Sequence, residues 1–403
     1  MIHFLKASVV VVGSILISLL GIEGLLYISE YGFHARPASS SIARFSRKPP
    51  FSFDPAARLG GSEDTSSFLV PTTFGEREIV NPNPGPRPVG GRKLVEQVDW
   101  SKRIESTFWN KDKPFHLAPG YAGRSIVRLK TGQLVYDVDV KVDDFGRRDT
   151  NNPDPQLRTK HLVMFGCSFV FGEGLEQAHT LPSQVAALAP DYFVYNYGVQ
   201  GAGPQDIAAR VEEIQVPQEV PQMTGIGLYL FISDHIRRTV PSISYLGFHK
   251  AAPYYAEDEK GEIRRYVNYQ AAHPMKALAY NVLEESEILN HFAVDIPMFF
   301  GEEHYRTTAH VISYFAHAYK KRFPQDEFYV VIFPDHPLFD GVMAHYLTQY
   351  GVKVLDYSHF NVRNYVKGLG TLSAIDPHPD AEADAVLADQ IVRDLRLTST
   401  VSR

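Results

Sequence analysis

The stretch His161-Leu-Val-Met-Phe-Gly-Cys-Ser-Phe-Val-Phe-Gly-Glu-Gly174 decides the fold of this chain. Its apolar run, His161 to Phe165, is flanked by polar sequence, which predicts a buried parallel strand. A helical pattern follows, from about 175 to 188. Ser168 is therefore expected at the carboxyl end of a strand, where open α/β sheets bind their ligands. A Gly-x-Ser corner is a weak signal alone, so the rest of the sequence must supply a base, an acid and oxyanion donors.

The length and composition indicate a globular protein. The chain has 403 residues, enough for one large domain with appendages or for two domains. The formal net charge of -6 argues against a nucleic-acid binder, because phosphate contacts need clustered lysines and arginines. The single cysteine, Cys167, excludes an internal disulfide and a zinc site built from cysteines.

The amino-terminal segment has the length of a membrane span. Residues 7–28 are almost uninterrupted apolar sequence, and we predict an uncleaved anchor over 1–33. The alternative, a cleaved signal peptide, would have a shorter apolar run and a small-residue cleavage site. Glu23, near the far end of the run, is expected at the membrane interface or paired with a helix of another protein. By the positive-inside rule, Lys6 on one side and Arg36, Arg44, Arg47 and Lys48 on the other leave the remaining chain in the cytoplasm.

The anchor is followed by a segment rich in proline, serine and glycine, which we assign as a connector over 34–119. Its alternating prolines at 82, 84, 86 and 88 exclude a regular helix and a central strand. We expect it to be partly extended and to lie over the following domain. Val138, Val140 and Val142 then alternate with charged residues, which predicts an edge strand or hairpin before the core.

The remaining sequence, 120–398, alternates strands and helices. Strands are expected at 161–165, 192–197, 227–232, 328–333 and 352–357, and helices at 175–188, 204–214, 304–321, 338–349 and 381–395. This rhythm predicts a parallel sheet of five strands with helices on both faces, a three-layer α/β/α sandwich. An insertion at about 236–303, with tyrosines at 245, 254, 255 and 266, could form a lid or one wall of the substrate cleft.

A second informative stretch, Asp376-Pro-His-Pro379, precedes the last helix. An imidazole at this place can act as a general base towards a hydroxyl, and a neighbouring carboxylate can hold its tautomer. The alternative is a turn that only caps the helix, since Asp and Pro are ordinary residues at a helix start.

Two further stretches complete a set of four: Tyr195-Asn-Tyr-Gly-Val-Gln-Gly-Ala-Gly203 and Leu228-Tyr-Leu-Phe-Ile-Ser-Asp234. In this order the motifs resemble the blocks of the SGNH, or GDSL, hydrolase family over roughly 120–398. The resemblance implies a flavodoxin-like SGNH fold. It makes Ser168 the nucleophile, His378 the base and Asp376 the acid, with oxyanion donors from Ser168, Gly201 and Ser233.

The sequence departs from the family pattern at three places. Cys167 replaces the Asp that precedes the serine, and Ser233 stands where the oxyanion Asn is expected. Asp376 lies two residues before His378 rather than three. Neither the nucleophile nor the base is lost, and Ser233 can still donate a hydrogen bond from its hydroxyl.

Other residues compete for these roles. Cys167 is a rival nucleophile, since a thiol at a helix start would have a lowered pKa. Asp335-His336, at the end of a later strand, is a rival acid–base pair, or simply a polar strand end. The histidines lack the spacing of a zinc protease, so we predict no metal, and no cofactor is implied. His235 beside Asp234 is expected to be structural.

These features together predict a membrane-anchored serine esterase that forms an acyl-enzyme on Ser168. The resemblance suggests O-acetyl esters of envelope or exported polysaccharide as substrates, and it places the catalytic domain outside the cytoplasm, against the flanking charges. One alternative is an O-acyltransferase that uses the same residues and a membrane-embedded acyl-donor partner. Another is an inactive domain that binds glycan or acts as a scaffold.

Overall fold

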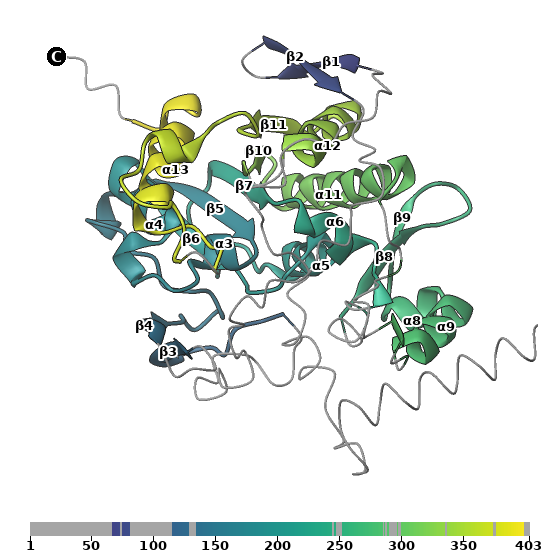
Figure 1. The fold of residues 1–403 in the computed structure, drawn as a ribbon. Coiled ribbons are helices and arrows are strands. Elements are labelled where there is room, and N and C mark those ends of the chain that lie inside the picture. The colour runs from purple at the N-terminus through teal and green to yellow at the C-terminus, as the bar shows by residue number, and fades with distance from the viewer. Residues whose placement is uncertain are drawn as a thin grey trace, which may run out of the picture.

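The computed structural model describes residues 67–72, 75–80, 115–128, 134–243, 252–284, 300–334, 337–373 and 376–398, with 246, 286, 288–289 and 296. Figure 1 shows one main body built on a twisted sheet with helices packed on both of its sides. Within this described part, no helix is both long enough and apolar enough to span a membrane. The anchor predicted over 1–33 lies outside the described residues.

The main body is built around a parallel sheet of five strands (Figure 1). These strands are β5 (Lys160–Gly166), β6 (Tyr192–Gly198), β7 (Gly225–Phe231), β10 (Glu327–Ile332) and β11 (Lys353–Asp356). Their spatial order is β11-β10-β7-β5-β6, and every neighbouring pair is parallel. Numbered along the chain, this is the flavodoxin-like order 2-1-3-4-5. The predicted five-stranded parallel sheet is therefore confirmed.

Helices cover both faces of this sheet and complete the three layers. The helices on one face are α4 (Leu181–Leu188) and α13 (Ala381–Asp394), and those on the other are α5 (Pro204–Glu213), α11 (Glu302–Arg322) and α12 (Pro337–Gln349). Alternate residues of β5 serve the two cores: Leu162 and Met164 pack under α4 and α13, while Val163 and Phe165 face α5 and α11.

The helix after β5 differs from the prediction. In place of one helix over 175–188, the chain forms the single turn α3 (Ser168–Phe171), the 3-10 turn η3 (Gln177–His179) and then α4. Gly172 and Gly174 have left-handed backbone angles, with φ of 84° and 69°, which no helix can continue through. Pro182 then fits the first turn of α4, where its missing N–H costs no hydrogen bond.

A buried polar group joins the sheet to α11 at the amino end of the strands. The His161 imidazole, fully buried, places Nε2 2.5 Å from Asp326 Oδ2 and Nδ1 3.0 Å from the Gln222 carbonyl oxygen. The Tyr319 hydroxyl donates to the same Asp326 oxygen over 2.7 Å, and the Gly225 amide donates to Oδ1 over 2.7 Å. Each polar atom is paired, which is the condition under which burial of such groups is tolerated.

Two small hairpins precede the sheet. Strands β3 (Ala122–Arg128) and β4 (Leu134–Lys141) pair antiparallel, as the alternation around Val138 predicts, but they form a separate two-stranded sheet. Strands β1 (Ser67–Thr72) and β2 (Gly75–Val80) form a hairpin within the predicted connector. This hairpin contacts α12, and β1 also contacts β11, so this part of the segment lies over the domain.

The insertion begins with α6 (Asp234–Thr239) and contains β8 (Tyr254–Glu257), β9 (Ile263–Tyr266), α8 (Tyr269–Ala272) and α9 (Pro274–Glu284). The β8–β9 hairpin packs against α11, and Glu212 of α5 accepts hydrogen bonds from Tyr255 and Arg265 over 2.9 and 2.7 Å. Tyr254 and Tyr255 are only 7% and 0% exposed, so they pack inside the protein and offer no surface to a substrate. Tyr266 is partly buried beside them, and Tyr245 lies outside the described residues.

Candidate active site

The corner after β5 places Ser168 at the first position of α3, with Cys167 at its N-cap. Two glycines allow this helical turn to fold back onto the sheet. A Cβ added at Gly166 would lie 2.5 Å from Val170 Cγ2, and one added at Gly198 would lie 2.2 Å from the Phe171 amide nitrogen. No side chain fits at either place, so the sequence of two neighbouring strand ends fixes the position of the serine.

Ser168, His378 and Asp376 lie within hydrogen-bonding distance in series. The Ser168 hydroxyl oxygen is 2.8 Å from His378 Nε2, and His378 Nδ1 is 2.6 Å from Asp376 Oδ1. A carboxylate only accepts hydrogen bonds, so Nδ1 carries the ring proton and Nε2 is left to accept the serine proton. This is the arrangement in which an imidazole removes a proton from a hydroxyl and a carboxylate stabilises the resulting imidazolium.

The spacing of two residues between Asp376 and His378 is compatible with this contact. Asp376 Oδ1 also accepts the His378 backbone amide over 3.1 Å, so the carboxylate folds over the following turn. The Asp376 amide in turn donates to the Ser373 hydroxyl over 3.1 Å. The Asp376 side chain is fully buried, while 15% of the His378 side chain is exposed. The imidazole is thus reachable from solvent and its carboxylate is shielded.

The loop between β11 and α13 holds the histidine in place. The His378 carbonyl oxygen accepts from the Leu372 amide over 2.9 Å, and Asp380 caps α13 by accepting from the Ala383 amide over 2.9 Å. The Phe169 ring packs against the imidazole with centroids 5.2 Å apart. The backbone around His378 is therefore held by hydrogen bonds, and its imidazole is packed against an aromatic ring.

The turn after β6 carries the second expected oxyanion donor. Gly198 pairs with Gly166 in the sheet register, and the Val199 amide donates to the Gly166 carbonyl oxygen over 3.1 Å. Gly201 follows with φ of 74°, a left-handed angle that favours glycine. Among the described residues, no hydrogen bond engages the Gly201 amide. The Ser168 amide, at the first position of a helical turn, has no intrahelical acceptor.

Ser233, the third expected donor, follows β7 and stands at the N-cap position of α6, without a capping hydrogen bond from its side chain. Strands β6 and β7 lie on the two sides of β5 and run parallel to it. Gly201, Ser168 and Ser233 follow these strands and therefore lie at the same carboxyl end of the sheet. His235, the next histidine along the chain, is fully buried, and its Nδ1 lies 2.7 Å from the Tyr229 hydroxyl. Burial holds the pKa of His235 well below its usual value, so this ring is neutral and structural.

Cys167 does not have the environment of a reactive thiol. Its side chain is fully buried, and burial raises the pKa of the thiol even though Arg238 lies close enough to lower it. The expectation of a lowered pKa at this helix start is therefore wrong, because loss of solvent outweighs the charge. The rival acid–base pair Asp335-His336 lies outside the described residues.

Two arginines near the corner, of which Arg148 is fully buried, were missed by the sequence analysis. Arg148 is 1% exposed and donates to the carbonyl oxygens of Phe171, Gly172 and Leu175 over 3.0, 2.6 and 2.5 Å, and burial lowers its pKa to about 10. Arg238, on α6, contacts the turn that contains Gly201. For Arg148 the sequence offers no signal, but the Asp234–Arg238 spacing of four residues is typical of an ion pair on a helix.

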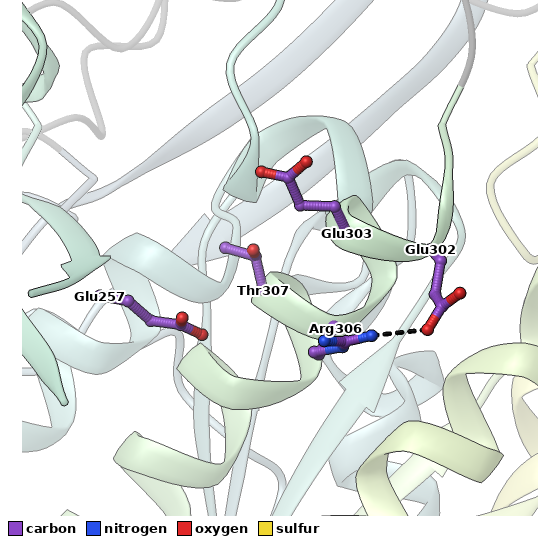
Figure 2. Close-up of a pocket in the computed structure, with 5 residues that line it drawn as sticks. All are labelled: Glu257, Glu302, Glu303, Arg306 and Thr307. Atoms are coloured by element: carbon purple, nitrogen blue, oxygen red, sulfur yellow. Dashed lines mark hydrogen bonds and ion pairs between the residues drawn. The ribbon is translucent and has the colours of Figure 1, made fainter. Parts of the chain in front are cut away.

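A separate pocket lies between the end of β8 and the start of α11 (Figure 2). Its lining residues are Glu257, Glu302, Glu303, Arg306 and Thr307. Arg306 forms an ion pair with Glu302 over 2.5 Å, as the dashed line in Figure 2 marks. None of these residues belongs to the Ser168 site, so the insertion helps to build a surface other than the predicted cleft.

Comparisons with known proteins find distant structural neighbours. No protein-family model matches the sequence, and no curated protein matches it. A lipolytic protein of the G-D-S-L family from Desulfitobacterium hafniense is 13% identical with a TM-score of 0.29, covering 58% of this chain and 99% of its own. An acetyl xylan esterase from the rumen bacterium Butyrivibrio proteoclasticus is 11% identical with a TM-score of 0.33, covering 60% of this chain and 65% of its own.

AlinE4, an esterase of the SGNH-hydrolase family, is 13% identical with a TM-score of 0.30 and covers 59% of this chain and 96% of its own. The sheet order 2-1-3-4-5 and the three layers are those of the flavodoxin-like fold that the resemblance to SGNH hydrolases implies.

Proposed function

We propose that this protein is a serine esterase of the SGNH type, which cleaves O-acyl esters through an acyl-enzyme on Ser168. The observation that carries the proposal is the 2.8 Å contact between the Ser168 hydroxyl and His378 Nε2, with Asp376 2.6 Å behind the ring. An inactive binding domain has no need of this contact. It is the contact that a general base requires.

The reaction follows from the positions of these groups. His378 Nε2 takes the proton of Ser168 as its oxygen attacks the ester carbon, and the imidazolium then gives that proton to the departing alcohol. The amides of Ser168 and Gly201, with the Ser233 hydroxyl, are the donors proposed for the developing oxyanion. Water, deprotonated by His378, attacks the acyl-enzyme; the imidazolium then returns that proton to the Ser168 oxygen as the bond to the acyl carbon breaks and the carboxylic acid leaves.

The substrate class that we propose is an O-acetyl ester of a saccharide of the envelope or of an exported polysaccharide. Its support is the order of the four sequence motifs, which resembles that of SGNH enzymes. We favour hydrolysis over transfer, because Tyr254 and Tyr255, on which an acceptor sugar could have stacked, are buried. Water is therefore the acceptor that we favour.

The experiment uses the full-length protein in detergent with para-nitrophenyl acetate and a fluorophosphonate probe. Wild type should hydrolyse the ester, and mass spectrometry should find the phosphonyl group on Ser168. Ser168→Ala should lower kcat by about three orders of magnitude or more, whereas Cys167→Ala should keep most of the activity. Labelling at Cys167, or the reverse order of the two variants, would refute the assignment.

We also propose that residues 7–28 anchor the protein and that the catalytic domain lies outside the cytoplasm. The support is the long apolar run and the resemblance to exported enzymes. A reporter fused after residue 403 that is active only in the cytoplasm would contradict this orientation.

A further inference from the structure

The guanidinium of Arg238 lies between the two chain segments that carry the proposed backbone oxyanion donors. Its Nη1 donates to the Ala202 carbonyl oxygen over 2.9 Å, one residue after Gly201. The same guanidinium lies close enough to the Cys167 thiol, one residue before Ser168, to act on its pKa. A single side chain therefore lies beside the immediate neighbours of both amides.

Arg238 is itself held firmly. Nε and Nη2 donate to Asp234 Oδ2 over 2.9 and 2.6 Å, and only 10% of the Arg238 side chain is exposed. Both bonds converge on one carboxylate oxygen, and these charge-assisted contacts hold the Nε–Nη2 side of the guanidinium at Asp234. Because α6 begins directly after Ser233, Arg238 also joins the helix that follows the third proposed donor to the turn that carries Gly201.

The turn that Arg238 contacts is otherwise fixed on both sides of Gly201. The Ala202 amide donates to the Val199 carbonyl oxygen over 3.1 Å, and the Gly203 amide donates to Asp206 Oδ2 over 2.8 Å. A Cβ added at Gly203 would lie 2.4 Å from Arg238 Cβ, so the turn and the arginine are packed in contact. The Ala202 carbonyl oxygen is the atom of the turn that Arg238 restrains.

We propose that Arg238 is a positioning residue, which sets the orientation of the Gly201 and Ser168 amides towards the developing oxyanion. This inference rests on the proposed esterase function and adds a residue to it. Oxyanion donors act only if they are preorganised, because a donor that must move during the reaction loses most of its effect. Preorganisation of the backbone amides matters more in this protein, because Ser233 replaces a side-chain amide. The Gly201 and Ser168 amides then supply a larger share of the hydrogen bonds to the oxyanion.

Arg210 provides a matched control. Its side chain is also 10% exposed, and its Nη2 donates to Glu219 Oε2 over 2.8 Å and to the Phe145 carbonyl oxygen over 3.1 Å. It thus makes the same kinds of contact from α5, but to a segment that carries no proposed donor. A loss of activity shared by variants of both arginines would reflect general destabilisation.

The test measures kcat and KM of the full-length protein with para-nitrophenyl acetate, well below the melting temperature of every variant. Arg238→Gln should lower kcat by about tenfold to a hundredfold and leave KM within about threefold, as expected for an interaction made only in the transition state. Arg238→Lys should recover part of kcat. Arg210→Gln should keep kcat within about threefold of wild type, even if its melting temperature falls as much as that of Arg238→Gln.

The pH profile separates positioning from a charge effect on the base. If Arg238 acts on the amides, the midpoint of the kcat/KM profile stays in place and only its plateau falls in Arg238→Gln. A shifted midpoint, an unchanged kcat, or an equal loss in Arg210→Gln would overturn the inference. A wild-type protein without esterase activity would instead overturn the proposed function, and with it this role.

Discussion

Replacing Asp206 by Asn should change how the stability of the protein depends on pH. Asp206 lies in the first turn of α5, is 6% exposed, and accepts the Gly203 amide through Oδ2 over 2.8 Å. Burial raises the pKa of this carboxyl from 3.8 to about 7, although the Gly203 amide and the Arg238 charge act in the opposite direction. Asn has the shape of the protonated acid and keeps an oxygen for the Gly203 amide.

The size of the effect follows from the two pKa values. A carboxyl whose pKa is raised in the folded state binds its proton more tightly there, so its contribution to stability is greatest below the unfolded value of 3.8. That contribution is lost as the pH rises through about 7. Between about pH 5 and about pH 8 the loss amounts to roughly 2.5 kcal/mol, at about 1.4 kcal/mol per pKa unit.

The assay is denaturant unfolding of wild type and Asp206→Asn followed by circular dichroism, at about pH 5 and about pH 8. The free energy of unfolding should fall more steeply in wild type, by about 2.5 kcal/mol over this interval. Asp384, whose pKa burial also raises, titrates in both proteins and cancels in the comparison. Asp258→Asn is the control, since hydrogen bonds from the Glu262 and Lys260 amides lower the pKa of Asp258 and its titration lies below the interval. Parallel curves for wild type and Asp206→Asn would refute the reasoning.

Three further substitutions have sharply different expected effects. The side-chain amide of Gln200, 3% exposed, has no hydrogen-bond partner within the described part of the chain, so Gln200→Leu should leave the melting temperature unchanged or raise it. Gln205→Leu should lower the free energy of unfolding by about 1–3 kcal/mol, and the melting temperature by several degrees. The reason is that the Gln205 side chain pairs with the Thr239 and Tyr255 backbones over 2.6 to 3.2 Å. Equal effects of the two glutamine variants in a thermal melt would contradict this. Asp376→Asn should lower kcat by about three to four orders of magnitude with an intact fold, since the His378 tautomer is no longer fixed, and a kcat near the wild-type value would remove Asp376 from the proposed role.

The order of strands and helices could be predicted because each buried strand is a short apolar run with polar flanks. The prediction failed at 175–180, where the backbone does not join the helix that begins at Leu181. Glu176 and Thr180 have extended backbones there, and just before them Gly172 and Gly174 take left-handed angles among carbonyl oxygens that Arg148 contacts. Periodicity records which side chains are apolar and contains no information on such distant backbone contacts.

The candidate site was predictable where chemistry and strand ends coincide. Ser168, Asp376 and His378 stand in short polar motifs next to apolar runs, and the structure brings them together. Arg238 and Arg148 were not predictable as parts of the site, because their partners are carbonyl oxygens of segments distant in the sequence. A backbone acceptor is the same in every residue, so no residue type signals it.

The sheet order explains why the proposed donors meet at Ser168. Along the chain β6 is added on one side of β5 and β7 on the other, so α4 and α5 leave towards opposite faces of the sheet. Their loops separate at the carboxyl end of β5, the switch point at which such sheets bind ligands. Helix α6 follows β7 at this place, and Arg238 reaches from it to the turn after β6. One side chain thus connects the loops of three adjacent strands, and a change in Arg238 should disturb catalysis more than it disturbs the apolar cores beneath.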